Sequence, residues 1–111
     1  MENCIFCKII AGDIPSPRFY EDEVMIVIKD IEPKAKLHYL CIPKTHFPTF
    51  ADMDETNAEQ VKHCFQKIPQ IAKTLGLEDG YRVIINQGEN GGQTVAHLHI
   101  HLLGGEKLGD F

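Results

Sequence analysis

Residues 96–105 read Ala-His-Leu-His-Ile-His-Leu-Leu-Gly-Gly and alternate three histidines with apolar residues. A period of two is that of a β-strand, in which successive side chains point to opposite faces. The sequence therefore predicts a strand that carries the histidines in one row and buries the apolar residues between them. Because each imidazole has polar nitrogens that need partners when buried, three in register indicate a functional face.

Length and charge limit the classes of protein to consider. The 111 residues predict one domain, over residues 1–111, with an apolar core. The formal net charge of −5 argues against binding a nucleic-acid backbone through a basic surface. No apolar run approaches the length of a membrane span, and the N-terminus, which includes Glu2, does not resemble a signal peptide. We therefore expect a cytoplasmic protein with no membrane or nucleic-acid partner.

The patterns along the chain predict an α+β fold. About five strands are expected to form an antiparallel sheet, with one long helix and a short N-terminal helix that Gly12 ends. The apolar run at 24–28 is typical of a strand covered on both faces. The other strands are expected at 18–21, 38–42, 81–86 and within the histidine stretch.

The long helix is expected over residues 54–75. Thr56 and Glu59 have the spacing of a capping box, Pro69 is expected to kink or locally break the helix, and Gly76 to end it. Its apolar residues recur at intervals of three and four and predict one buried stripe. They are Ala58, Val61, Phe65, Ile68, Ala72 and Leu75.

The four cysteines are expected to be thiols or metal ligands, because disulfides are rare in the cytoplasm. Cys4 and Cys7 have the spacing of half a zinc site, which needs two further ligands, and histidines are the candidates. The same spacing occurs in thioredoxin-like redox motifs, but those follow a strand, and here only three residues precede it. His46, in a loop, would by itself be taken as a solvated histidine. Cys64 is expected to be a core residue or a residue on the face of the long helix.

A glycine-rich loop at 87–94 is expected to close a hairpin onto the histidine stretch. Glycines allow backbone N–H groups to approach an anion, and Asn86 and Thr94 are suited to hold one. The loop is not a P-loop, because no Gly-Lys-Ser/Thr and no helix follow. The histidine row then has two interpretations: a catalytic metal centre, or a histidine nucleophile for phosphorus. The row contains no Asp or Glu, which favours a negatively charged substrate.

Residues 97–103, His-Leu-His-Ile-His-Leu-Leu, resemble the histidine triad motif His-φ-His-φ-His-φ-φ that names the HIT superfamily. The resemblance covers nearly the whole chain and is closest to the Hint branch, whose motif ends like Leu102-Leu103-Gly104-Gly105. It implies a HIT-like fold in a single HIT domain, and a homodimer whose two sheets join into one. The other matching segments are Cys4 and Cys7, Lys29-Asp30-Ile31, His38, Ile42-Pro43-Lys44-Thr45-His46, Asn86 and Gly91-Gly92-Gln93-Thr94.

The resemblance implies a nucleotide-binding phosphoramidase. Such enzymes cleave a P–N or related bond at the α-phosphate of a purine (AMP- or GMP-like) nucleotide through a nucleotidyl-histidine intermediate, without an organic cofactor. The alternatives are a dinucleoside polyphosphate hydrolase and a nucleotide-binding or interaction module with little turnover. The chain has no tryptophan, whereas several Hint proteins carry one in a longer tail, so the leaving group stays open.

The resemblance also assigns roles to individual residues. His99 matches the nucleophile, His101 a phosphate contact and His38 the residue that orients the row. Asp30 matches the residue that holds the ribose hydroxyls, with Ile31 against the base. The phosphate-binding loop is matched by Asn86, Gly92, Gln93 and Thr94. In members with a CxxC motif two cysteines and two histidines hold a structural Zn²⁺, and the matching residues are Cys4, Cys7, His46 and His97.

Overall fold

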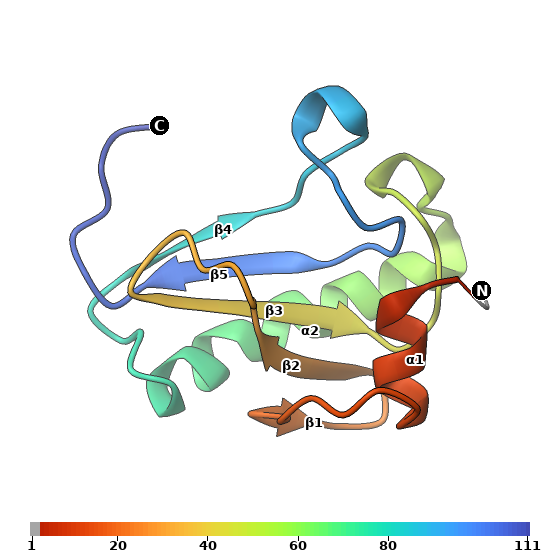
Figure 1. Ribbon diagram of the computed structural model, residues 1–111, viewed down its shortest axis with the longest axis horizontal. Helices are drawn as coiled ribbons and strands as arrows, with labels where there is room; N and C mark the ends of the chain where they lie inside the picture. Colours follow the sequence, from red (N-terminus) through yellow and green to blue (C-terminus); the bar gives the residue numbers. More distant parts are fainter. Residues whose placement is uncertain (1–2) are drawn as a thin grey trace.

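The computed structural model describes residues 3–111, so Glu2 and the expectation about a signal peptide that used it lie outside the described residues. The fold is α+β, with a five-stranded antiparallel sheet in the order β1-β2-β3-β5-β4 (Figure 1). In the described part no helix is both long and apolar enough to cross a membrane. The elements are α1 (Ile5–Ala11), β1 (Tyr20–Glu21), β2 (Met25–Lys29), β3 (Leu37–Pro43), the 3₁₀ turn η1 (Phe50–Asp52), α2 (Glu55–Thr74), β4 (Tyr81–Ile84), the 3₁₀ turn η2 (Glu89–Gly91) and β5 (Ile100–Gly104).

The two helices cover opposite faces of the sheet (Figure 1). In β2, Met25 and Val27 belong to the apolar cluster with α2, whereas Ile26 and Ile28 belong to the cluster with α1. Since successive side chains of a strand face opposite sides, this explains why the whole apolar run is buried. The prediction of a strand covered on both faces is confirmed.

The first helix brings the cysteine motif to the sheet. Cys4 is its N-cap, and the Cys4 sulfur accepts a hydrogen bond from the Cys7 N–H at 3.3 Å. Gly12, with a φ of 87°, ends the helix as expected, since glycine enters the left-handed region without steric cost. Phe6 and Ile9 are buried against the sheet, so α1 packs by its apolar side.

The long helix α2 occupies the expected residues but differs in three details. The capping box is formed by Asp54 and Asn57, so its prediction at Thr56 and Glu59 was wrong. The structure buries Cys64 in the core and leaves Phe65 42% exposed, so Phe65 was wrongly placed in the apolar stripe. The helix continues through Pro69 without a break, because this turn lies on the exposed side, where water can bind the freed carbonyl.

The histidine stretch joins the sheet later than predicted. β5 begins at Ile100, so the prediction that all three histidines lie within the strand was wrong for His97 and His99. Before β5 the chain is held by the segment that follows β3, where the Leu98 N–H donates to the Phe47 carbonyl at 2.9 Å. The alternation nevertheless persists, and the core beneath α2 contains Leu98, Ile100 and Leu102.

Candidate functional site

Five histidine rings and one phenylalanine ring form a continuous row on the face that α1 covers. Neighbouring ring centroids are 4.9–5.1 Å apart within each histidine pair. Phe6 of α1 connects the two groups of histidines in the middle of the row, with its ring edge-on at 5.8 Å from His97 and 5.0 Å from His99. The histidines follow in the order His46, His97, His99, His101 and His38.

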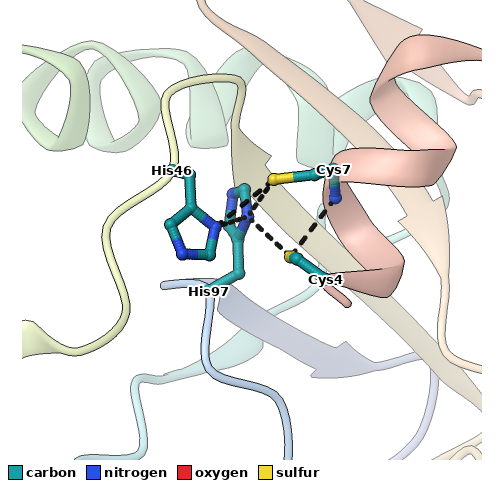
Figure 2. A group of neighbouring side chains, drawn as sticks. All are labelled: Cys4, Cys7, His46 and His97. Atoms are coloured by element: carbon teal, nitrogen blue, oxygen red, sulfur yellow. Dashed lines mark hydrogen bonds between the residues drawn. The ribbon is translucent and has the colours of Figure 1, made fainter. Parts of the chain in front are cut away.

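The cysteine end of this row has the dimensions of a tetrahedral metal site (Figure 2). The Nδ1 atoms of His46 and His97 are 3.2 Å apart. The Cys4 sulfur lies 3.3 Å and the Cys7 sulfur 3.6 Å from His97 Nδ1, and the Cys7 sulfur lies 3.3 Å from His46 Nδ1. Zinc bonds to nitrogen and sulfur at tetrahedral angles separate the donor atoms by about 3.3–3.8 Å.

The protonation of the ligands also fits a metal. The His97 Nε2–H donates to the Pro43 carbonyl at 2.8 Å, so the Nδ1 lone pair faces the cluster. Burial lowers the pKa of His97 to about 4, which keeps the ring neutral near pH 7. Burial and the adjacent Cys4 thiol raise the pKa of Cys7, so a bound cation would have to displace the thiol protons.

A second cluster lies at the other end of the row, where ligand atoms of Asp30, His38 and His101 also lie within 4.8 Å of one another. His38 Nε2 lies 2.9 Å from His101 Nδ1 and 3.4 Å from Asp30 Oδ2. The Lys34 backbone N–H, however, donates to His38 Nδ1 at 3.0 Å. A neutral imidazole that accepts at Nδ1 carries its proton on Nε2, so the atom that faces this cluster has no lone pair for a metal. The arrangement is therefore a hydrogen-bond chain.

This chain determines the tautomer of His101. Because the His38 Nε2–H donates to His101 Nδ1, the proton of His101 lies on Nε2. His101 Nε2 is buried and has no hydrogen-bond partner within residues 3–111. Burial, followed by the neighbouring His99 and His38, lowers the pKa of His101 to about 4. The ring is therefore neutral near pH 7 and offers one unpaired N–H to a ligand.

His99 has the opposite tautomer. Its Nδ1 lies 2.7 Å from the His97 carbonyl oxygen, and since a carbonyl can only accept, the proton lies on Nδ1. Nε2 then keeps its lone pair, and burial lowers the pKa of His99, so this nitrogen stays unprotonated near neutral pH. A nucleophilic nitrogen thus lies beside an N–H donor, which is an arrangement suited to attack on an anionic centre.

Among the residues expected to bind the nucleotide, Asp30 lies next to this pair, with a carboxylate oxygen within 4.8 Å of a His101 ring nitrogen. Asp30 follows β2, its Oδ1 accepts from the Glu32 N–H at 2.8 Å, and its Oδ2 faces His38. The neighbouring Ile31 side chain is 92% exposed, which is unusual for a large apolar residue. Asn86 is half-buried, whereas Gly92 and Thr94 are exposed in the loop that connects β4 to β5.

Sequence reasoning missed the groups that fix these tautomers. They are the backbone N–H of Lys34 and the backbone carbonyls of Pro43 and His97. It also missed Phe6, whose ring packs on the triad from within the cysteine motif. Backbone groups are common to all residues and leave no signal in a sequence, and Phe6 has only the signal of an apolar residue in a short helix.

Comparison with known proteins places this arrangement in context. The family model described as "Scavenger mRNA decapping enzyme C-term binding" matches residues 3–110. Protein HitA of Neisseria gonorrhoeae is 49% identical over 104 residues, which cover 94% of this chain and 97% of that protein. The "14 kDa zinc-binding protein" of Zea mays is 44% identical over 106 residues, which cover 94% and 83% of the two chains.

The similarity extends to solved structures. A HIT family hydrolase from Clostridium thermocellum superposes with a TM-score of 0.94 at 47% identity, covering 100% of this chain and 97% of that one. A histidine triad protein from Clostridium difficile gives a TM-score of 0.94 at 42% identity, with the same coverage.

Proposed function

This chain belongs to the histidine triad (HIT) superfamily, and from that premise we propose that it is a nucleotide-binding phosphoramidase. The substrate is a purine nucleoside phosphoramidate, cleaved at the P–N bond of its α-phosphate. The observation that carries the proposal is the pair of opposite tautomers, with a lone pair on His99 Nε2 and an N–H on His101 Nε2.

In the proposed reaction, His99 Nε2 attacks the α-phosphorus and forms an N–P bond. The amine leaves with the electron pair of the original P–N bond and takes up a proton. The His99 ring becomes cationic, and its Nδ1–H keeps its hydrogen bond to the His97 carbonyl, which stabilises the charge. The His101 Nε2–H donates to a phosphate oxygen as charge develops on it. Water then cleaves the N–P bond of the intermediate, releasing the nucleoside monophosphate.

The nucleoside would lie beside the second cluster. Asp30 accepts hydrogen bonds from the ribose hydroxyls through the lone pairs that Glu32 and His38 leave free, since a carboxylate can accept about four. The exposed Ile31 provides an apolar contact for the base. Asn86, Gly92 and Thr94 complete the phosphate side, where backbone and side-chain donors replace a basic residue.

We also assign a structural Zn²⁺ to Cys4, Cys7, His46 and His97, whose donor types, spacing and tautomer fit this ion. When bound, the ion provides a closed four-ligand link between α1 and the start of the histidine stretch. His97 then holds the nucleophile through its carbonyl while its ring serves the metal. The zinc-binding protein of Zea mays supports the assignment.

The proposed assembly is a homodimer whose two sheets join. β4 lies at one edge of the described sheet and leaves backbone N–H and C=O groups for a further strand. Its Val83 side chain is 39% exposed, and burial against a second copy would remove this apolar surface from water.

The test is whether the protein hydrolyses adenosine 5′-phosphoramidate and releases AMP, with the reaction monitored by phosphorus NMR. The expected result is turnover by the wild-type protein. Cleavage of a dinucleoside polyphosphate in its place would favour the alternative hydrolase. AMP binding without cleavage of either compound would favour a binding module.

A further inference from the structure

Gln93 holds two loops together through its side-chain amide. Its Oε1 accepts from the Gly88 N–H at 2.9 Å. Its Nε2 donates to the Pro48 carbonyl at 2.7 Å and to the Val95 carbonyl at 3.0 Å. A flipped amide would place its oxygen against two carbonyl oxygens, so this orientation is fixed.

These contacts use both N–H groups of the amide. A primary amide has two donors, and here each has a backbone carbonyl as acceptor. A phosphate could accept from Gln93 only after one of these bonds was broken. The resemblance to HIT proteins placed Gln93 among the phosphate contacts, and the geometry points to a different role.

On one side, the contacts of Gln93 close the glycine loop. The Gln93 backbone N–H donates to the Gly88 carbonyl at 3.0 Å, so Gln93 binds both backbone groups of Gly88. The ring that results contains η2 and has glycines with positive φ near both ends, 70° at Gly88 and 86° at Gly92. The residues on either side of Gln93 are Gly92 and Thr94, both assigned to the phosphate.

On the other side, the contacts reach the segment that follows His46. Pro48 lies two residues after this proposed zinc ligand, and the next residue back, Phe47, accepts from the Leu98 N–H. Gln87 provides a further link, because its Oε1 accepts from the Ala51 N–H at 2.8 Å. The amide of Gln93 therefore connects the phosphate loop to the segment that carries His46.

We propose that Gln93 is a positioning residue, which holds the backbone of residues 88–94 in the conformation that receives the α-phosphate and does not itself donate to the phosphate. The inference rests on the proposed function, because it assumes that this loop binds phosphate. Donors fixed before binding need no reorganisation, so loss of the amide weakens phosphate binding without removing a phosphate contact.

The direct test follows the Gln93 side-chain NH₂ by NMR in wild-type protein, free and with AMP. We expect its protons to be protected from solvent exchange in both states and to show no coupling to phosphorus. Protons that exchange freely in the free protein and become protected only with AMP, or that couple to ³¹P, would make Gln93 a phosphate ligand and overturn the inference.

A variant tests the consequence. Gln93→Met keeps the length of the side chain and removes all three hydrogen bonds, so AMP should bind about 10-fold more weakly while adenosine binds as before. Amide exchange at Gly88 should accelerate in the free protein. Gln66→Met, on the exposed side of α2, is the matched control and should change neither.

Each negative outcome has a distinct meaning. Equal losses for AMP and adenosine, or a lower melting temperature alone, would make Gln93 merely structural and overturn the inference. If Gln93→Met does not fold, the NMR experiment on wild-type protein still decides. If wild-type protein binds neither AMP nor adenosine, the proposed function fails and the inference fails with it. If wild-type protein binds AMP but the Gln93 amide protons exchange freely before AMP is added, only the inference is overturned.

Discussion

The two ends of the histidine row contain similar groups and are suited to different chemistry. At each end, the ligand atoms of two histidines lie within 4.8 Å of one another and of either two cysteine sulfurs or one aspartate oxygen. They differ at the ring nitrogen that faces away from the cluster. At this nitrogen His97 donates to a carbonyl, so its other nitrogen, which faces the cluster, has a lone pair. His38 accepts there from the Lys34 N–H, so its nitrogen that faces the cluster carries a proton. Ligand type and distance alone therefore do not identify a metal site, because the outer hydrogen bond decides which atom can coordinate.

The largest expected effect concerns which cluster holds zinc. Cys7→Ser should lower the zinc content from about one ion per chain to near zero, because a serine hydroxyl is a poor replacement for a thiolate. Elemental analysis of protein purified without added zinc measures this.

Two control variants separate the clusters. Asp30→Asn should keep its zinc, because the second cluster turns a proton toward its centre. Cys64→Ala should also keep it, since Cys64 lies on the buried side of α2, in the core. Loss of zinc from Asp30→Asn, with retention in Cys7→Ser, would reverse the assignment of the two ends.

The next effect separates structural from catalytic histidines. His99→Ala removes the proposed nucleophile and should lower the rate by at least about 10²-fold, with no nucleotidyl adduct. Zinc content should be unchanged, because the His97 ring is held by the Pro43 carbonyl and not by His99. Turnover is measured with adenosine 5′-phosphoramidate, and a variant as fast as wild type would remove His99 from the mechanism.

The sequence predicted those features of the fold that depend on the periodicity of apolar residues. The alternation from Leu98 to Leu102 identifies which side chains enter the core beneath α2, and the run from Met25 to Ile28 identifies a strand with two covered faces, because these are local consequences of backbone geometry. The resemblance brought Cys4 and Cys7 together with two distant histidines, and the structure places all four within ligand distance. The catalytic and zinc roles themselves stay predictions.

The parts that could not be predicted depend on tertiary partners. Phe65 is four residues from Val61, a spacing that also fits a core residue, and it is the packing of α2 on the sheet that buries Cys64 and leaves Phe65 exposed. The histidine stretch joins the ladder at Ile100 because Phe47, from another loop, holds Leu98. The tautomers follow from backbone groups of Lys34, Pro43 and His97, which any residue would provide.

A smaller effect is expected from pH. Burial depresses the pKa of His101 from 6.5 to about 4, so below pH 6.5 the unfolded chain binds a proton that the folded chain excludes. This contribution to stability is fully present above pH 6.5 and is lost as the pH falls toward 4. It amounts to about 2 kcal/mol once solvent screening of the partly exposed ring is allowed for.

Denaturant unfolding at several pH values, compared between wild type and His101→Gln, isolates this contribution from other groups. Glutamine has no proton to gain, so the difference in unfolding free energy between the two proteins should change with pH between 6.5 and 4. Parallel curves for the two proteins would show that His101 is charged or solvated in the folded state.

The smallest expected effect is at the ribose end of the second cluster. If Asp30 accepts the ribose hydroxyls, AMP should bind more tightly than 2′-deoxy-AMP. A hydrogen bond to a charged group contributes about 1–3 kcal/mol, and we expect about 1 kcal/mol, or roughly 5-fold in Kd, because Glu32 and His38 already share this carboxylate. Asp30→Asn should reduce the preference, since an amide has only one oxygen to accept. Calorimetric titration of both nucleotides against both proteins gives the comparison. Equal affinity of wild type for the two nucleotides would leave Asp30 only its contact with His38, so that the second cluster would act on the phosphate and not on the sugar.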